Sequence, residues 1–282
     1  RPRREFDAKA GRWMMVESYP LMINHFLATV FFSIDALLMK PLLGGVRADA
    51  ALGYYSTAYK FIDGLNIIPA YLTLAIFPLM SRYAQEASDA LRRAYILSLR
   101  LLMLIAIPLS TGTFLLADRI ILLFFGEKML PASGHALALL IWFLPFSYIN
   151  SVTQYALIAV NQQRFLTRAF IIGASFNIVA NLLLIPRYSF MGAAATTILS
   201  EIVLFVPFYY CVRKHITVLP FAELFWRPIV ASAVMGASMW LLVGHIHWLL
   251  TVPVAVVVYA VALLVIGGVT REDMEMVRRA RR

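Results

Sequence analysis

Cysteine and charge are both scarce in this sequence. Of its 282 residues, only Cys211 is a cysteine, and only 14% are charged. A single cysteine excludes a disulfide framework and a metal site built from cysteines. The hydrophobic fraction is 61%, far above the roughly 45–50% of soluble domains. A soluble domain could not bury so much apolar surface, so we expect the chain to lie in lipid.

The sequence also lacks the motifs of common enzyme classes. It has no glycine-rich phosphate loop, no serine or cysteine nucleophile motif, and no paired acidic cluster suited to metal-assisted phosphoryl chemistry. The short histidine pair before the last apolar block falls short of the three or four ligands that a metal site needs. We therefore expect neither an enzyme nor a bound cofactor or metal.

Apolar residues arrive in blocks of about 20, the length at which a helix crosses roughly 30 Å of hydrocarbon. The expected fold is an all-α polytopic membrane bundle of about eight transmembrane helices. The predicted spans are Trp13–Met39, Leu52–Met80, Ala94–Ala117, Ala136–Val160, Phe165–Ile185, Met191–Val212, Pro228–Val243 and Trp248–Val269.

Lys and Arg residues are distributed unevenly over the segments between these spans. Successive segments between spans lie on alternate sides of the membrane. Eighteen Lys and Arg residues fall on the side that holds both chain ends, and five fall on the other side. Cytoplasmic loops retain Lys and Arg, so both termini are expected in the cytoplasm. The net charge of +10 could suggest a nucleic-acid partner. The basic residues form no face interleaved with aromatic residues, however, so we expect no nucleic-acid binding.

The chain is expected to contain five segments. It begins Arg-Pro-Arg-Arg without an initiator Met, as expected of a fragment that starts in a loop. The basic tail can also contact anionic membrane lipids. The segments are a basic cytoplasmic segment 1–12, a six-helix transport lobe 13–212, a cytoplasmic loop 213–227, two additional helices 228–269 and the basic tail 270–282.

Prolines lie well inside four of the spans, at Pro69, Pro108, Pro145 and Pro207. Each removes a backbone hydrogen bond and kinks its helix. Transporters tolerate such breaks where neighbouring helices or a water-filled cavity satisfy the freed carbonyls. Proline is also common in membrane helices in general, so both explanations stay open.

Several motifs occur in a specific order. Leu52–Tyr83 reads LGYYSTAYKFIDGLNIIPAYLTLAIFPLMSRY and follows SIDALLMKPLLG at Ser33–Gly44. Ala159–Gln163 reads AVNQQ, and Phe176–Thr197 reads FNIVANLLLIPRYSFMGAAATT ahead of Glu201. Together these motifs resemble the polysaccharide flippases of the MOP superfamily, in particular the O-antigen and exopolysaccharide flippases.

This resemblance implies a fold of two pseudo-symmetric lobes around a central cavity. The spans would be helices 7–14 of a MATE-like fold, its C-terminal lobe, and the first lobe would be a missing partner. The implied function is flipping of an undecaprenyl-diphosphate-linked oligosaccharide across the bacterial inner membrane, for surface polysaccharide such as the O-antigen of lipopolysaccharide. The alternatives are a cation-coupled multidrug antiporter of the MATE type, a lipid II flippase, or an inactive structural fragment that needs a separate first lobe.

Two charged residues, Lys60 and Asp63, lie three apart on one face of the second span. A charge near the bilayer centre costs about 2.5–3.5 kcal/mol on insertion scales, so both need compensation or a function. They can form an ion pair, or Lys60 can attract the phosphates of a lipid-linked sugar. Near the outer end of the first span, we expect Asp35 to pair with Lys40.

Glu201 lies about halfway along the sixth span without a charge within one helical turn. It is a candidate for ion coupling, or a protonated side chain bonded to a neighbouring helix. Arg100 can contact phosphate or extend to the cytoplasmic interface. The remaining candidates for substrate binding are polar amides at i, i+4 spacing, which can bind sugar hydroxyls or bond helices together: Asn150, Gln154, Asn177 and Asn181.

Overall fold

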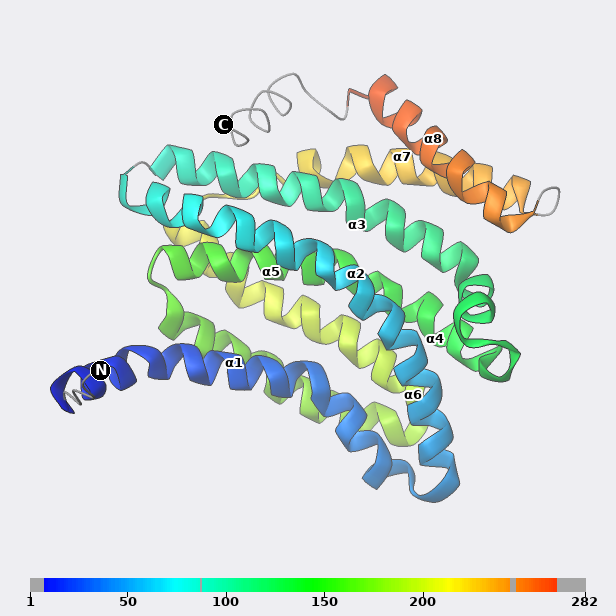
Figure 1. The fold of residues 1–282 in the computed structure, drawn as a ribbon, viewed down its shortest axis with the longest axis horizontal. Helices are drawn as coiled ribbons and strands as arrows, with labels where there is room; N and C mark the ends of the chain where they lie inside the picture. The colour runs from blue at the N-terminus through cyan, green and yellow to red at the C-terminus, as the bar shows by residue number, and fades with distance from the viewer. Residues whose placement is uncertain (1–7, 87, 244–246, 268–282) are drawn as a thin grey trace, which may run out of the picture.

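The computed structural model describes residues 8–86, 88–243 and 247–267, which fold into helices and short turns without a β-strand among them (Figure 1). The basic tail expected at 270–282 lies outside these residues, as do the first seven residues of the basic segment. The helices are α1 (Ala8–Leu43), α2 (Gly45–Glu86), α3 (Ser88–Phe125), α4 (Ala132–Leu140), α5 (Leu144–Ala159), α6 (Gln163–His215), α7 (Phe221–Leu242) and α8 (Trp248–Val265), with 3₁₀ turns η1 (Glu127–Met129) and η2 (Ile141–Phe143).

Seven helical segments in the described ranges are long and apolar enough to cross a membrane. One of them, α6, has 53 residues, which at about 1.5 Å per residue is more than twice the ~30 Å of hydrocarbon. The prediction of an all-α membrane bundle of about eight helices is confirmed, because α6 makes two of the passes.

The fold-back of α6 occurs at Ser189, whose backbone angles (φ 55°, ψ −138°) are not helical. Phe165 stacks on Tyr210 with ring centroids 6.3 Å apart, although the two residues lie at opposite ends of α6. The rings of Phe170 and Phe208 also meet across α6, edge to face, with centroids 5.8 Å apart. The two halves of α6 are therefore an antiparallel hairpin, as the two separate spans of the sequence predict.

Two boundaries differ from the prediction. The fourth pass is interrupted by η2, immediately before Pro145 near the start of α5. The seventh pass begins at Phe221 rather than at Pro228, and α6 ends at His215. Most of the loop expected at 213–227 is therefore helical. Pro228 lies inside α7 rather than at its start.

Two of the four prolines singled out in the sequence are compensated by neighbouring helices. Proline lacks the N–H that would bond to the carbonyl four residues earlier. Each freed carbonyl accepts a hydrogen bond from a hydroxyl group on another helix. The pairs are Tyr148 to Leu65 (2.6 Å) for Pro69 and Tyr259 to Leu104 (2.8 Å) for Pro108. Pro145 instead lies in the first turn of α5, where its missing N–H costs no helical bond.

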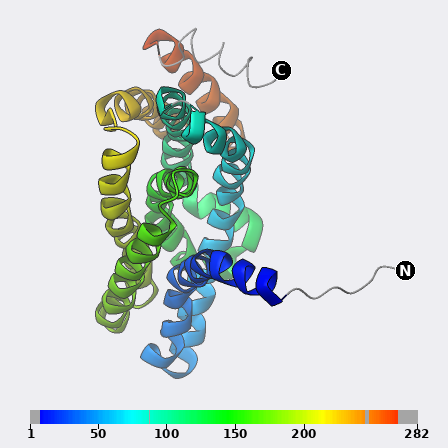
Figure 2. The same ribbon diagram turned by 90° about the vertical axis from the view of Figure 1, so that its left-hand side faces the viewer.

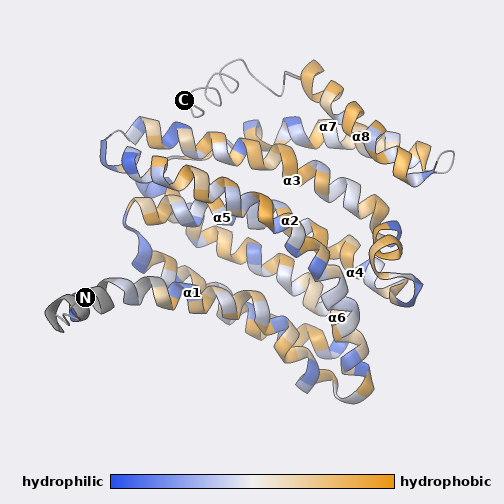
Figure 3. Cartoon of the chain, in the orientation of Figure 1, coloured by the Kyte–Doolittle hydropathy of each residue, from blue (hydrophilic) through white to orange (hydrophobic). Residues whose placement is uncertain are grey.

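The helices run along the long dimension of the molecule, and α8 lies beside α7 at its outer edge, far from α1 (Figures 1 and 2). The closest packing joins α1 to α6, α3 to α7, α7 to α8 and α5 to α6. Hydrophobic residues cover the lengths of the helices, and hydrophilic residues gather near the helix ends (Figure 3). This distribution is typical of helices whose outer faces contact lipid.

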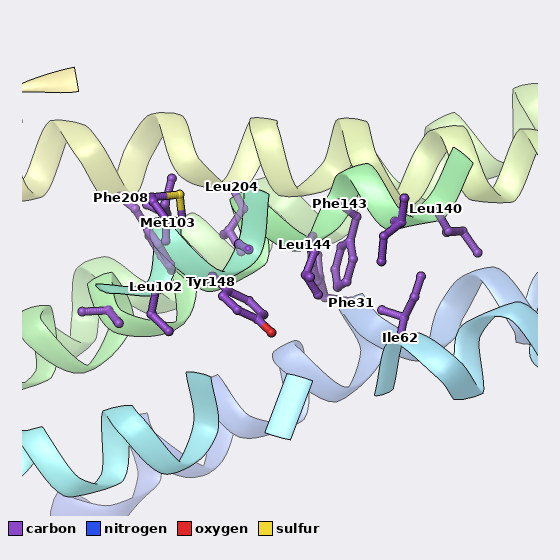
Figure 4. Packing of buried hydrophobic residues seen from close by; sticks show 14 of the residues in the cluster. Phe31, Ile62, Leu102, Met103, Leu140, Phe143, Leu144, Tyr148, Leu204 and Phe208 are labelled. Atoms are coloured by element: carbon purple, nitrogen blue, oxygen red, sulfur yellow. The ribbon is translucent and has the colours of Figure 1, made fainter. Parts of the chain in front are cut away.

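One core of buried side chains is shared by the helices from α1 through α6. Phe31, Ile62, Phe143, Tyr148 and Phe208 lie among its members, which come from helices far apart in the sequence (Figure 4). By contrast, α8 exposes many aliphatic side chains, including Val256, Val257 and Leu264. The first six passes therefore form the packed body, and α7 and α8 attach to it along α3.

Candidate functional site

A polar cavity with a volume of about 440 Å³ lies between α1, α2, α5 and both halves of α6. This volume falls within the roughly 300–1,000 Å³ of small-molecule sites. Its lining residues are Phe32, Ser33, Tyr59, Asp63, Asn66, Pro69, Ala70, Ser147, Asn150, Ser151, Gln154, Phe170, Glu201, Leu204 and Phe208.

Two helices supply the polar stripes of the cavity. On α5, Ser147, Asn150, Ser151 and Gln154 recur at i, i+3, i+4 and i+7, so that they share one helical face. On α2, Tyr59, Asp63 and Asn66 follow the same periodicity, one turn before Pro69. Pro69 itself also lies in the cavity wall.

The deepest polar contact joins Glu201 on α6 to Asn150 on α5. The Asn150 Nδ2 group donates to Glu201 Oε2 at 2.6 Å and to the Glu201 carbonyl oxygen at 2.9 Å. Glu201 is only 1% exposed and Asn150 only 4%. No Lys, Arg or His side chain forms an ion pair with Glu201 in the described part of the chain. Of the two explanations for Glu201, the structure thus displays the hydrogen bond to a neighbouring helix.

The charged residues that line the cavity are both acidic. Asp63 and Glu201 contribute carboxyl groups, and none of the described residues in the lining is basic. Aromatic rings form much of the remaining wall. Tyr59 packs against Tyr55 (5.6 Å between centroids) and against Phe143 (6.4 Å), which holds its ring in place.

Of the candidates that the sequence singled out, four come together in this cavity: Asp63, Asn150, Gln154 and Glu201. Lys60 is exposed on α2 and forms no ion pair with Asp63 in the described part of the chain. Arg100 lies on α3, which supplies none of the lining residues. The structure therefore does not display the expected Lys60–Asp63 pair.

Asn177 and Asn181 also lie away from this cavity, at the contact of α6 with α1. Asn181 Nδ2 donates to Asn177 Oδ1 at 2.7 Å, and Asn177 Nδ2 donates to the Phe31 carbonyl oxygen at 3.4 Å. The bond from Asn177 to Phe31 joins α6 to α1, which was the second explanation for the amide pairs, whereas the bond between Asn181 and Asn177 lies within α6.

The expected pair of Asp35 and Lys40 is wrong. Lys40 Nζ instead lies 3.1 Å from Asp49 Oδ1 at the exposed junction of α1 and α2. Asp35 is 3% exposed, and its carboxylate accepts hydrogen bonds from the Tyr55 phenol and, at 3.3 Å, from the Thr197 hydroxyl. Five residues of helix place Asp35 and Lys40 on different faces, so Asp35 points into the bundle.

Sequence reasoning missed several lining residues, notably Tyr59, Asn66, Ser147 and Ser151. Their signal was present as a helical stripe, because each lies three or four residues from a candidate that was found. The aromatic lining from α1 and α6 carried no such signal, since aromatic residues are common throughout these spans.

The family model for "Polysaccharide biosynthesis protein" matches residues 1–134. Among curated relatives, an uncharacterized membrane protein of Methanocaldococcus jannaschii, MJ1068, is 25% identical over 206 residues, covering 71% of this chain and 39% of that protein. Agl15 of Haloferax volcanii, described as a probable low-salt glycan biosynthesis flippase, is 26% identical over 160 residues, covering 56% of this chain and 34% of that protein. The chain thus spans less than half the length of these relatives.

A solved structure with a similar fold is the lipid II flippase MurJ in an inward closed conformation. It matches with a TM-score of 0.70 and 16% identity, covering 94% of this chain and 56% of MurJ. At this identity the likeness concerns the fold alone.

Proposed function

We propose that this chain, which is similar to polysaccharide biosynthesis proteins over residues 1–134 and to a probable glycan biosynthesis flippase, forms one lobe of a transporter that moves a lipid-linked oligosaccharide from the cytoplasmic to the outer leaflet. The proposed carrier is undecaprenyl diphosphate in a bacterial inner membrane, with both chain ends in the cytoplasm, as the basic residues predict. The proposed product is surface polysaccharide, for example the O-antigen of lipopolysaccharide. Such transport needs no covalent step.

The polar cavity is the observation that carries this proposal. An oligosaccharide can cross hydrocarbon only if its hydroxyl groups find hydrogen-bond partners on the way. The amide and hydroxyl stripes of α2 and α5 offer such partners inside an otherwise apolar bundle. A volume of about 440 Å³ holds part of a glycan, while the acyl tail can stay in the bilayer.

A second lobe is proposed to complete the site. The chain covers 56% of MurJ, and its cavity is built from helices of one bundle. We place the chain as the C-terminal lobe, whose cavity would face that of the other lobe. Transport would then follow from rocking of the two lobes around the shared cavity.

The diphosphate is proposed to lie outside the acidic cavity. No basic residue of the described chain lines the cavity, and two carboxyl groups would repel phosphate. Lys60 is exposed and lies one helical turn before Asp63, where it can contact a phosphate while the glycan occupies the cavity. Arg100 remains a second candidate for a phosphate contact.

The test is a flipping assay in proteoliposomes with a fluorescent lipid-linked oligosaccharide and a membrane-impermeant quencher. The natural protein that contains this chain is compared with its Gln154→Ala variant, which removes an amide from the cavity wall. We expect flipping by the natural protein, and flipping several-fold slower in the variant because glycan hydroxyls lose a partner.

Gln85→Ala is the matched control, since Gln85 is exposed on α2 and does not line the cavity. It should flip at the natural rate. Absence of flipping by the natural protein with any lipid-linked glycan would overturn the proposal.

A further inference from the structure

We propose that the cavity binds a protonated amine through the carboxyl groups of Asp63 and Glu201. This inference rests on the proposed function and deepens it, because it assigns an amino group to the part of the glycan that enters this lobe. The same chemistry would also admit a free organic amine, and the experiment below separates the two sources.

The first argument is that the buried side-chain atoms of the cavity wall that lack a hydrogen-bond partner in the described part of the chain are all acceptors. Glu201 Oε1, Asn150 Oδ1 and Asn66 Oδ1 are buried and have no hydrogen-bond partner among the described residues. All three residues line the cavity. Both amide protons of Asn150 are already used on Glu201, so Asn150 offers only its oxygen. A ligand that satisfies these oxygens must bring hydrogen-bond donors, as an ammonium group with three N–H bonds does.

The second argument is charge. Asp63 and Glu201 reach the same cavity from α2 and α6, and its lining in the described ranges includes no Lys, Arg or His. A buried carboxylate without a cation is costly. An ammonium group supplies the missing positive charge, whereas a neutral hydroxyl supplies donors alone and a phosphate would be repelled.

The third argument is the aromatic wall. Phe32, Tyr59, Phe170 and Phe208 line the cavity together with the carboxyl groups. The negative faces of aromatic rings attract cations, and proteins use such rings to bind ammonium ligands. The rings also offer apolar surface to a sugar face. Acceptors, charge and aromatic rings thus favour the same class of ligand.

The experiment measures binding of small probes to the purified natural protein in nanodiscs by saturation-transfer NMR and calorimetry. The probes are glucosamine, glucose, N-acetylglucosamine and ethylamine. Glucosamine should bind about tenfold or more tightly than glucose and N-acetylglucosamine, because hydrogen bonds to charged groups exceed those between neutral groups by this order. Equal binding of glucosamine and N-acetylglucosamine would overturn the proposal.

Two variants test the carboxyl groups. Glu201→Gln and Asp63→Asn keep the shape of each side chain and remove its charge, so each should weaken glucosamine binding by about tenfold. Glu86→Gln and Asp49→Asn are the matched controls, since both residues pair with basic side chains away from the cavity. Asp63→Asn is informative even if Glu201→Gln disturbs folding, because Asp63 is exposed at the cavity. Unchanged binding in Asp63→Asn would contradict the proposal.

Comparing the binding of glucosamine with that of ethylamine shows whether the bound amine belongs to a sugar or is a free organic amine. If glucosamine binds much more tightly than ethylamine, the amine belongs to a sugar; if ethylamine competes equally, the site takes free organic amines. Failure of this inference alone would leave flipping of lipid-linked glycans intact in Asp63→Asn. Failure of the proposed function would instead abolish flipping in the natural protein, so the two results are distinguishable.

Discussion

The Tyr259 phenol on α8 donates a hydrogen bond of 2.8 Å to the Leu104 carbonyl oxygen on α3. That carbonyl is the one that Pro108 leaves without its helical N–H. The bond therefore compensates a proline kink and also fastens the last helix to the packed body. Tyr148 on α5 does the same for Leu65 and Pro69 at the cavity.

The first prediction concerns this pair. Tyr259→Phe should lower the free energy of unfolding by about 1 kcal/mol, because a freed carbonyl loses its partner in an apolar setting. The midpoint of thermal unfolding in detergent measures the change. In a Pro108→Ala background the same substitution should cost little, since an alanine at this position restores the helical hydrogen bond. An equal loss in both backgrounds would show that Tyr259 acts by packing alone.

A second prediction concerns the hairpin of α6. A Cβ atom added at Gly192 would overlap the Leu184 carbonyl oxygen, a backbone atom that cannot move aside. Gly192→Ala should therefore destabilise the chain by about 1–3 kcal/mol or more. Gly53→Ala is the control, because a Cβ there meets nothing within 4 Å. Comparable thermal stability of the two variants would contradict the close approach of the two halves of α6.

A third prediction concerns the buried carboxylate of Asp35. Tyr55→Phe should destabilise the bundle by about 1–3 kcal/mol, because the carboxylate loses a hydrogen-bond donor inside the membrane. Adding Asp35→Leu to Tyr55→Phe should recover part of this loss, since no buried charge is then left unpaired. Thermal unfolding of the single and double variants measures the coupling. Tyr188→Phe, at an exposed position on α6, should change nothing, and additive losses in the double variant would count against the contact.

The fourth prediction tests the phosphate contact proposed for Lys60. Lys60→Ala should slow flipping of a lipid-linked oligosaccharide by about threefold to tenfold, because a charge-assisted contact is lost. The difference should shrink at high salt, since Lys60 is exposed and its field is screened. Lys128→Ala, at an exposed position in η1, serves as the control. Natural rates in Lys60→Ala at low salt would remove Lys60 from the site.

Much of the fold was determined by the sequence alone. The lengths of the apolar blocks require helices, because lipid leaves the backbone no other hydrogen-bond partners. Even the hairpin of α6 was foreseen as two spans, Phe165–Ile185 and Met191–Val212, because each apolar block is about as long as one crossing of the bilayer. The prolines marked where helices need outside hydroxyl groups, although not which groups supply them.

Tertiary structure decided which polar residues meet. Glu201 and Asn150 are 51 residues apart, and Asp35 and Thr197 are 162 apart, so no local spacing could join them. Lys60 and Asp63 share a helix face in the sequence, yet only Asp63 lines the cavity. The physical reason is that periodicity orients a side chain about its own helix, whereas the packing of helices against one another selects its partner across the bundle.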